Sequence, residues 1–470
     1  MDHDVTDLST RRELFVDYKL IDRLLQTRLK LHEPRPAEVA IRIDRPWEGP
    51  FNGGCCVFEY EGSYRMYYRG MAAHGGPNLC YAESADGIQW SKPDLGLVDI
   101  DGSRDNNVIV ADTPNYDIFL DTRPGVAADE RIKMTRYSVE GERLTPYFAG
   151  KGRKAVHLLA SGDGLTFREL GAEPILTCDL PNAFDSHNIF FWSEAEQQYL
   201  CYFRIMDPLR TMARTSSPDL HHWSDPVAMD YGNTTREQLY TNSTTPYFRA
   251  PHIYIALPAR FMQGRRVVTD AQLAGMDVAS AGKHTYYNDC SDAVFMSTRA
   301  GTTRYERTFM EAFLRPGPGP SNWVSRTNYP LHGIIQTGPD EISFFASRDY
   351  AQPTWHLRRF ALRTDGFISV NAPYGGGEMV TRPCVFSGRE LEINYATGAA
   401  GDLQVEIQDA NGQAVPGYAL DDCDTIVGDE IERTVTWAGG SDVSRLAGRP
   451  IRLRFAMRDA DLYALRFRAA

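Results

Sequence analysis

A short strand-and-turn unit that recurs along the chain constrains its fold more than any other feature. A serine, a tight turn and an aromatic residue occur together at Ser84-ADGIQ-Trp90, Ser161-GDGLT-Phe167 and Ser217-PDLHH-Trp223, and a degenerate copy lies at Ser297-TRAGTTR-Tyr305. Each copy follows a β-rich run, and Asp-Gly and Pro-Asp are typical of hairpin turns. Because the side chains of such turns bond turn amides, we expect these motifs to be structural. Repetition of this kind indicates an array of similar β units.

A second element recurs before each turn and raises the number of units to five. It is an apolar or alternating strand that ends in arginine, and another strand precedes it each time. The five arginines are Arg69, Arg136, Arg204, Arg260 and Arg348. Five antiparallel units without strong helical periodicity between them predict an all-β fold, a five-bladed β-propeller.

The regions on either side of the repeats differ from them in pattern. Residues 1–46 are predicted to be a helical or extended lead-in that packs on the propeller, since DYKLIDRLL (17–25) has helical spacing. The propeller is expected over 47–365. After a glycine-rich tract (371–379) a new run of alternating strands begins, which predicts a C-terminal β-sandwich over 366–470.

Composition narrows the partners that such a chain can have. Lys and Arg total 50 against 62 Asp and Glu, a formal charge of −12, so no basic excess exists to bind nucleic acid or an anionic membrane. The eight cysteines are scattered, and no P-loop, GxSxG, HExxH or dinucleotide motif occurs. We therefore expect a carbohydrate as the partner, no nucleic acid or membrane, no cofactor and no metal, with self-association left open. The expected location is cytoplasmic, or secreted or periplasmic if a leader has been removed.

Polar residues at particular strand ends of every blade should lie together at one mouth of the propeller. The start of strand 1, the end of strand 2 and the start of strand 3 of every blade share one face. Carboxylates expected there are Glu48, Asp121, Asp185, Glu237 and Asp292. Carboxylates that converge on one site are what glycoside hydrolysis needs, because one protonates the leaving oxygen and another activates water or attacks the anomeric carbon.

The same residues allow a structural interpretation. Each carboxylate could pair with a strand-ending arginine and so close the blades as a ring of ion pairs, or some arginines could bind a carboxylate or sulfate of the substrate. Trp47, Tyr240, Trp323 and Tyr329 could stack on a sugar ring. The candidate substrate-binding residues are Glu48, Asn52, Arg69, His187, Asn188, Arg204, Asn242, Arg260, Asp292, Trp323 and His332.

The segment from Phe261 to Cys290 is long and irregular. It lies between strands 2 and 3 of the fourth unit, so it should overhang the mouth. We interpret it as a specificity loop or a partial lid.

The arrangement resembles the five-bladed propeller glycoside hydrolases, both the invertase/levanase-like family 32 and the arabinanase/xylosidase-like family 43. Phe119-Leu120-Asp121-Thr122-Arg123-Pro124 is similar to the blade 2 Arg-Asp-Pro motif of the invertase group, which implies that Asp121 stabilises the transition state. Asp185 falls where that group has its blade 3 acid/base residue, which implies a proton donor. Blade 1 departs from the pattern, since Asn52 and Gly53 stand where the group has its nucleophilic aspartate.

Together these features predict an exo-acting glycosidase, and analogy with those families suggests furanosides as substrates. Asp185 would be the general acid, Asp121 the stabiliser and Glu237 the base or nucleophile. The alternative is a non-catalytic carbohydrate-binding propeller, and a protein-interaction platform is a third reading. Carboxyl groups of Asp185 and Glu237 about 5 to 10 Å apart would favour catalysis. Ion pairs of both with arginines, together with a plugged mouth, would favour binding.

Overall fold

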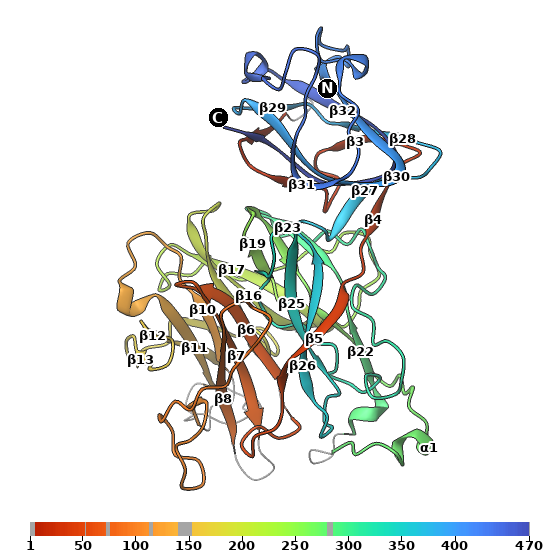
Figure 1. The fold of residues 1–470 in the computed structure, drawn as a ribbon. Coiled ribbons are helices and arrows are strands. Elements are labelled where there is room, and N and C mark those ends of the chain that lie inside the picture. The colour runs from red at the N-terminus through yellow and green to blue at the C-terminus, as the bar shows by residue number, and fades with distance from the viewer. Residues whose placement is uncertain are drawn as a thin grey trace.

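The computed structural model describes residues 5–51, 53–71, 76–111, 116–139, 153–279 and 285–469. Within these ranges the chain is nearly all β and forms a five-bladed propeller with a second β unit at one end (Figure 1), which confirms the predicted fold class. Helical structure there is limited to short turns: α1 (Asp270–Leu273), η1 (Ala128–Glu130), η2 (Tyr286–Asn288), η3 (Leu420–Asp422) and η4 (Ser444–Leu446).

The first three blades are antiparallel sheets of consecutive strands. Blade 1 contains β6 (Gly53–Tyr60), β7 (Ser63–Met71), β8 (Pro77–Ser84) and β9 (Val108–Val110). Blade 2 contains β10 (Tyr116–Leu120), β11 (Ile132–Val139) and β12 (Lys154–Ser161), and both β13 (Arg168–Glu169) and β14 (Leu176–Cys178) pair with β12. Blade 3 contains β15 (Ile189–Ser193), β16 (Gln198–Asp207), β17 (Leu209–Ser217) and β18 (Val227–Ala228).

The last two blades are less regular. Blade 4 consists of β19 (Thr245–Tyr247), β20 (Ala250–Ala256) and β23 (Met296–Arg299), with the ribbon of β21 (Ala259–Met262) and β22 (Cys290–Ala293) extending it. Blade 5 contains β24 (Ile335–Gln336), β25 (Glu341–Arg348) and β26 (His356–Arg363), and its outer strand is β5 (Arg35–Arg42). Because β5 comes from the N-terminal segment, this blade joins two distant parts of the chain.

The hydrophobic cores of the propeller lie between neighbouring blades. Tyr67 of blade 1 and Ile118 of blade 2 belong to one buried group, and Phe119 of blade 2 and Phe190 of blade 3 stack at 6.0 Å in the next. Strands β10 and β15 contact neighbours on both faces, which explains why their sequences are continuous apolar runs rather than alternating ones. Burial of both faces fixes the inner strands and, with them, the residues at their ends.

The recurrent serine-turn motifs connect the third and fourth strands, as expected from the sequence. Ser84 Oγ accepts from the Gly87 amide, and Asp86 Oδ1 accepts from the amides of Ile88 and Gln89. The same bonds recur around Asp163 and Asp219. These aspartates satisfy turn amides and have a structural role.

The second unit is a ten-stranded sheet that fits a β-sandwich. Its two long strands, β30 (Glu390–Asp409) and β32 (Ile451–Arg468), pair along most of their length, with a shift of register between Thr397 and Asp402. Shorter strands complete it: β27 (Ile368–Ala372), β28 (Gly377–Thr381), β29 (Cys384–Phe386) and β31 (Asp429–Thr434). Phe367 packs on Phe295 and Tyr247 of blade 4, so the two units share a continuous core.

The N-terminal segment, expected as a lead-in on the propeller, divides between the two units. Strands β1 (Thr6–Ser9), β2 (Glu13–Leu14), β3 (Ile21–Leu25) and β4 (Arg28–Leu31) all join the C-terminal sheet, whereas β5 closes blade 5. The helical spacing over 17–25 does not produce a helix, because Ile21–Leu25 pairs with β28. Sheet hydrogen bonds outweigh the weak local preference there.

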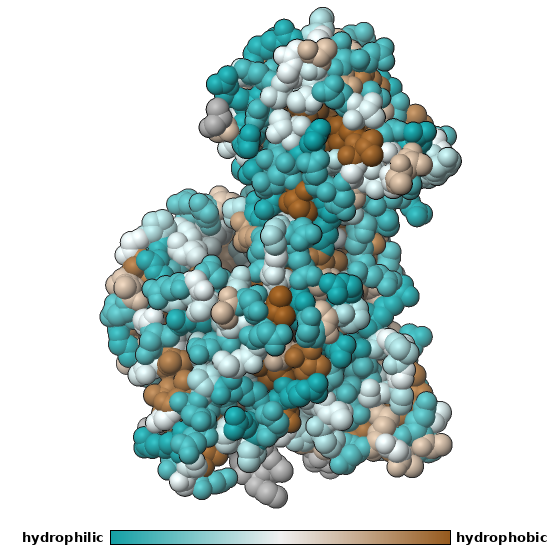
Figure 2. All heavy atoms as spheres, in the orientation of Figure 1, coloured by the Kyte–Doolittle hydropathy of each residue, from teal (hydrophilic) through white to brown (hydrophobic). Residues whose placement is uncertain are grey.

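The visible face in Figure 2 is mainly hydrophilic, with hydrophobic residues in small separate groups. No helix in the described ranges is long and apolar enough to cross a membrane.

Candidate active site

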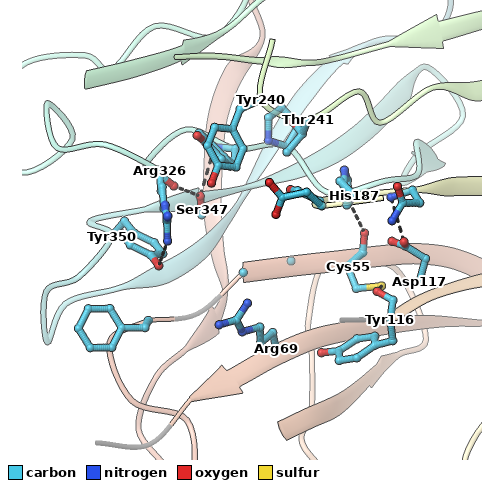
Figure 3. Close-up of a pocket in the computed structure, with 18 of the residues that line it drawn as sticks. Cys55, Arg69, Tyr116, Asp117, His187, Tyr240, Thr241, Arg326, Ser347 and Tyr350 are labelled. Atoms are coloured by element: carbon cyan, nitrogen blue, oxygen red, sulfur yellow. Dashed lines mark hydrogen bonds between the residues drawn. The ribbon is translucent and has the colours of Figure 1, made fainter. Parts of the chain in front are cut away.

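A cavity of about 240 Å³ lies on the propeller axis, and all five blades contribute to its wall. Its lining, drawn in Figure 3, comes from strand ends and the loops before them. Blade 1 contributes Gly53, Gly54, Cys55 and Arg69, blade 2 Tyr116, Asp117 and Tyr137, blade 3 Asp185 to Asn188, blade 4 Tyr240 and Thr241, and blade 5 Arg326, Tyr329, Pro330, Ser347 and Tyr350. The cavity is therefore at the mouth where the sequence placed the chemistry.

Asp117 is the buried carboxyl group of this cavity. It is the second residue of β10, and its Oδ2 accepts from the Tyr137 hydroxyl at 2.8 Å and from the Asn188 amide at 2.9 Å. Burial raises the pKa of Asp117 to about 8, and these two hydrogen bonds offset only part of the effect. At neutral pH Asp117 therefore carries a proton.

Asp185 is the exposed carboxyl group of the same cavity, with 33% of its side chain accessible. Its Oδ2 accepts from the guanidinium of Arg204, which is itself buried and also donates to the Tyr240 carbonyl at 3.2 Å. Within the described part of the chain Oδ1 accepts no hydrogen bond. Asp185 is thus a carboxylate held by an arginine on one oxygen and open to solvent on the other.

Two residues that line the cavity and one beside it have left-handed backbone although they are not glycines. His187 (φ 50°) and Arg326 (φ 62°) line it, and Ser243 (φ 48°) contacts His187. Such conformations typically cost about 1 to 3 kcal/mol each and are found where surrounding packing fixes them, often at functional sites. Here they turn side chains at the starts of blades 3, 4 and 5.

His187 and Asn188 line the cavity between blades 3 and 4, and Asn242 packs behind them. His187 Nε2 donates to the Cys55 carbonyl at 3.2 Å, and burial lowers the pKa of the ring to about 4, so it is neutral. Asn188 lines the cavity, and its buried Oδ1 has no partner among the described residues. Asn242 is fully buried and donates to the His187 carbonyl at 3.0 Å. Asn242 therefore positions the loop rather than facing the cavity.

Asp121 does not lie at this mouth, which corrects the expectation from the sequence. It follows the end of β10, whereas Tyr116 and Asp117 at the beginning of that strand line the cavity. Asp121 is buried, accepts from the Tyr199 hydroxyl at 2.9 Å and lies 3.3 Å from Lys133 Nζ. The sequence pattern placed Asp121 at the start of this strand, but β10 begins five residues earlier, at Tyr116. Asp121, which was expected to stabilise the transition state, therefore lies at the other end of the strand and forms a structural ion pair with Lys133.

Glu237 and Asp292 also lie outside the cavity lining and share one arginine. Arg260 binds Asp292 through two hydrogen bonds of 2.9 and 2.6 Å and donates to Glu237 at 2.8 Å. Arg307 binds the second oxygen of Glu237. This cluster matches the structural interpretation of the arginines, and Glu237 is not among the residues that line the cavity with Asp117 and Asp185.

The remaining predicted residues are distributed over the propeller. Glu48 is completely buried and accepts from the Tyr68 hydroxyl at 2.6 Å and from Lys92 at 2.7 Å. Trp323 donates to the Gly317 carbonyl outside the cavity. His332 lies further along the channel, where burial lowers its pKa to about 3 with a smaller contribution from His187. Asn52 lies outside the described residues.

Of the four aromatic candidates, two line the cavity and two do not. Tyr240 and Tyr329 line the cavity, with ring centres 5.3 Å apart. Trp47 instead donates to Asn107. Burial raises the pKa of the Tyr240 phenol, but Arg326, Arg204 and Arg210 around it outweigh burial and lower the pKa below its usual value. Tyr240 is therefore a ring surrounded by cations.

The long segment between β21 and β22 packs at the rim of the cavity. Tyr286 of this segment contacts Phe51 at 5.7 Å and Tyr350 at 5.2 Å, and both of these rings line the cavity. Figure 1 shows α1 at the end of the propeller away from the C-terminal unit. The segment thus contributes a wall on the blade 5 side; part of it, residues 280–284, lies outside the described ranges.

Sequence reasoning missed several lining residues, above all Asp117, Arg326 and Tyr350. A signal for Asp117 was present, because aligning the apolar runs of blades 2 and 3 places Asp117-IFL beside Asn188-IFF. The cavity also shows no carboxylate from the described part of blade 1, where Gly53 and Gly54 form the wall. No cluster of three or more metal-binding side chains occurs among the described residues.

Comparison with known proteins gives similarity to solved propeller structures. No family model matches the chain, and no curated protein matches its sequence. Similar structures include an N-acetylgalactosamine deacetylase from F. plautii in complex with blood group B trisaccharide (11% identity, 71% of this chain and 95% of that one, TM-score 0.44). A thermostable family-43 glycoside hydrolase (12%, 67% and 90%, 0.40) and an exo-β-1,3-galactanase from Phanerochaete chrysosporium (10%, 90% and 100%, 0.37) are also similar.

The expected resemblance to family 43 thus appears among the structural neighbours, while that to family 32 stays a prediction. Similarity at this level carries no argument about reaction or substrate. Those are argued from the cavity itself.

Proposed function

We propose that this propeller is a carbohydrate-active enzyme, a glycoside hydrolase in which Asp117 is the general acid and Asp185 the general base. The observation that carries the proposal is the contrast between two carboxyl groups of one cavity. Burial keeps Asp117 protonated, whereas Asp185 is 33% exposed and bonds the guanidinium of Arg204 through one oxygen. Environments that separate two carboxyl groups in this way assign the acid and the base.

The proposed chemistry follows from these two states. Asp117 donates its proton to the glycosidic oxygen as the bond to the anomeric carbon breaks, and Asp185 Oδ1 accepts a proton from the attacking water. Tyr240 and Tyr329 offer ring faces for a sugar. This assignment moves the acid from Asp185 to Asp117 and leaves Glu237 in its ion pairs.

We further propose that the enzyme is exo-acting. The cavity volume of about 240 Å³ is smaller than the roughly 300 to 1,000 Å³ of drug-sized ligand sites. It suits the terminal residue of a glycan better than an internal stretch. A furanose ring remains an analogy with the resembled families.

The test is sugar release from a panel of aryl glycosides and oligosaccharides by the parent protein, Asp117→Asn and Asp185→Asn. Each variant should lose about a hundredfold or more of kcat/KM. For the parent, kcat/KM should fall as the pH rises through about 8, where Asp117 loses its proton. Asp179→Asn, an exposed aspartate outside the cavity lining, serves as the control and should behave as the parent.

Two outcomes would contradict the proposal. Undiminished release by Asp117→Asn would remove its role as the acid. If no protein of the series released sugar although all bound glycans, the chain would be a carbohydrate-binding propeller. The arginine pairs of Asp185 and Glu237 are the observation that favours this second function.

A further inference from the structure

The five arginines that end the second strands differ in whether they have an acidic or carbonyl partner. Four of them do: Arg136 binds Glu169, Arg204 binds Asp185, Arg260 binds Asp292, and Arg348 binds Asn328 and the Pro316 carbonyl. Arg69 is the exception. Within the described part of the chain its side chain makes one hydrogen bond, to the Met71 sulfur at 3.3 Å, and its buried Nε has no partner there.

Arg326 is a second cation of the cavity without a carboxylate among the described residues. Its guanidinium donates to the Tyr350 hydroxyl at 3.4 Å and lies over the rings of Tyr286 and Tyr350 at 5.2 and 5.9 Å. Figure 3 shows Arg326 beside Tyr350 and Arg69 entering from another blade, with the space of the cavity between them.

These two side chains give the cavity a positive charge in a protein whose formal charge is −12. Asp117 is protonated and His187 is neutral at pH 7, and the charge of Asp185 is balanced by Arg204. Taking a cation out of water without a partner is unfavourable, and an anion that enters the cavity offsets that penalty. Guanidinium groups bind carboxylate, sulfate and phosphate through paired hydrogen bonds.

We propose that Arg69 and Arg326 form an oxyanion subsite in this cavity, so that the ligand is an acidic sugar or a sugar bound together with a free oxyanion. The inference rests on the proposed function in placing a sugar beside the two arginines. The shared chemistry is an oxyanion, borne either by the sugar as a carboxylate or sulfate or by free sulfate or phosphate.

The test measures binding by calorimetry with matched probes: galacturonic acid against galactose, glucuronic acid against glucose, glucose 6-sulfate, and inorganic sulfate and phosphate alone. An acidic or sulfated sugar should bind the parent at least about tenfold more tightly than its neutral counterpart, or inorganic sulfate or phosphate should bind at least about tenfold more tightly than chloride. Arg69→Met and Arg326→Met should each weaken that binding about 10- to 100-fold. Added salt should weaken it in the parent as well.

Arg136→Met is the matched control, because Arg136 also ends a second strand but binds Glu169 and does not line the cavity. It should bind the anionic probe as the parent does. Arg69→Lys and Arg326→Lys keep the charge without the paired geometry and should show intermediate affinity. These variants also serve if a methionine variant fails to fold.

The probes distinguish the two sources of the oxyanion, the sugar itself and a free ion. Tighter binding of the acidic sugars alone would assign the oxyanion to the substrate, and binding of inorganic sulfate or phosphate would assign it to a free ion. Equal affinity for charged and neutral probes, or full affinity in both methionine variants, would overturn the proposal. Release of neutral sugars without any preference for anions would overturn the oxyanion subsite and leave the proposed hydrolase intact. Anion binding without sugar release would support the subsite and contradict the proposed hydrolase.

Discussion

Asp117 and Asp121 are four residues apart at the two ends of one inner strand, yet their surroundings differ. Asp117 has a hydroxyl and an amide as donors, and burial keeps its proton in place. Asp121 has the ammonium group of Lys133 at 3.3 Å and is an ion-pair partner. The two residues therefore respond differently to the same substitution.

Stability should fall with rising pH because of Asp117. Its pKa is 3.8 in the reference state and about 8 in the folded protein, so between these values the folded state binds more protons than the unfolded one. The free energy of unfolding should lose up to about 1.4 kcal/mol per pH unit from this group between pH 5 and 8. Asp117→Asn should abolish this slope, so that its stability matches that of the parent below about pH 4 and exceeds it increasingly as the pH rises toward 8, as measured by denaturant unfolding at each pH.

Asp121→Asn is the comparison for that experiment. It leaves the buried ammonium group of Lys133 without its nearest carboxylate and should reduce the free energy of unfolding by about 3 kcal/mol at pH 7. A steep pH slope that persisted in Asp117→Asn would show that another group binds the proton.

The sequence identified several of the residues that line the cavity, but it misplaced or missed others. Asp185, His187, Asn188, Arg69, Tyr240 and Tyr329 were placed at the mouth and line the cavity. Asp121 was not, because the beginning of an inner strand cannot be read from a continuous apolar run, in which no alternation fixes the ends. Arg326 was missed because it lies in an irregular loop before blade 5 without any repeat to mark it.

Among the elements, β6 of blade 1 shows how tightly the blades fit around the cavity. A Cβ at Gly54 would lie 1.9 Å from the buried Leu331 side chain of blade 5, whereas a Cβ at Gly53 meets no atom within 4 Å. One glycine thus permits contact between blades, and its neighbour faces open space.

We expect Gly54→Ala to destabilise the protein by about 1 to 3 kcal/mol through overpacking. Gly53→Ala should change the free energy of unfolding by less than about 0.5 kcal/mol, yet weaken ligand binding because its methyl group enters the cavity. Thermal unfolding of both variants, with sugar binding for the second, tests the pair. Equal destabilisation would mean that Leu331 moves aside or that Gly53 is more confined than the structure shows.

The blades themselves could be predicted, because each repeats a local pattern of strand, turn and aromatic residue. The four N-terminal strands could not. Their partners lie more than three hundred residues away, as the 353-residue separation of Arg12 and Asp365 illustrates, and no local pattern records such pairing. Short strands without β alternation, like Ile21–Leu25, become strands only through those partners.

For the molecule as a whole, the N-terminal segment ties the C-terminal sheet to the propeller by buried ion pairs. Glu13 binds Arg299 at 3.0 Å and lies 2.8 Å from His252, both of blade 4. Burial raises the pKa of Glu13, but Arg299 and His252 outweigh burial and lower it to about 2. The contribution of Glu13 to stability is complete above pH 4.5 and declines as the pH falls toward 2.

Glu13→Gln should therefore lower the free energy of unfolding by about 3 kcal/mol at pH 7, and the difference from the parent should shrink as the pH falls below 4.5. Denaturant unfolding at pH 7, 5 and 3.5 measures it. Glu33→Gln, an exposed partner of Arg315, should change stability by less than about 1 kcal/mol. A similar loss in both variants would rule out a special role for the buried pair.

The division of the N-terminal segment between both units also sets an order of events during synthesis. Residues 6–31 leave the ribosome long before β27 to β32 exist, and at about 5 to 20 residues per second the 353 residues between Arg12 and Asp365 take roughly 20 to 70 seconds. Until β26 is made, β5 lacks its partner in blade 5, and until β27 to β32 are made, the strands of residues 6–31 lack their sheet. A growing chain of this kind exposes unpaired strand edges until β32 has been made, so we expect its yield to depend on chaperones that shield such edges.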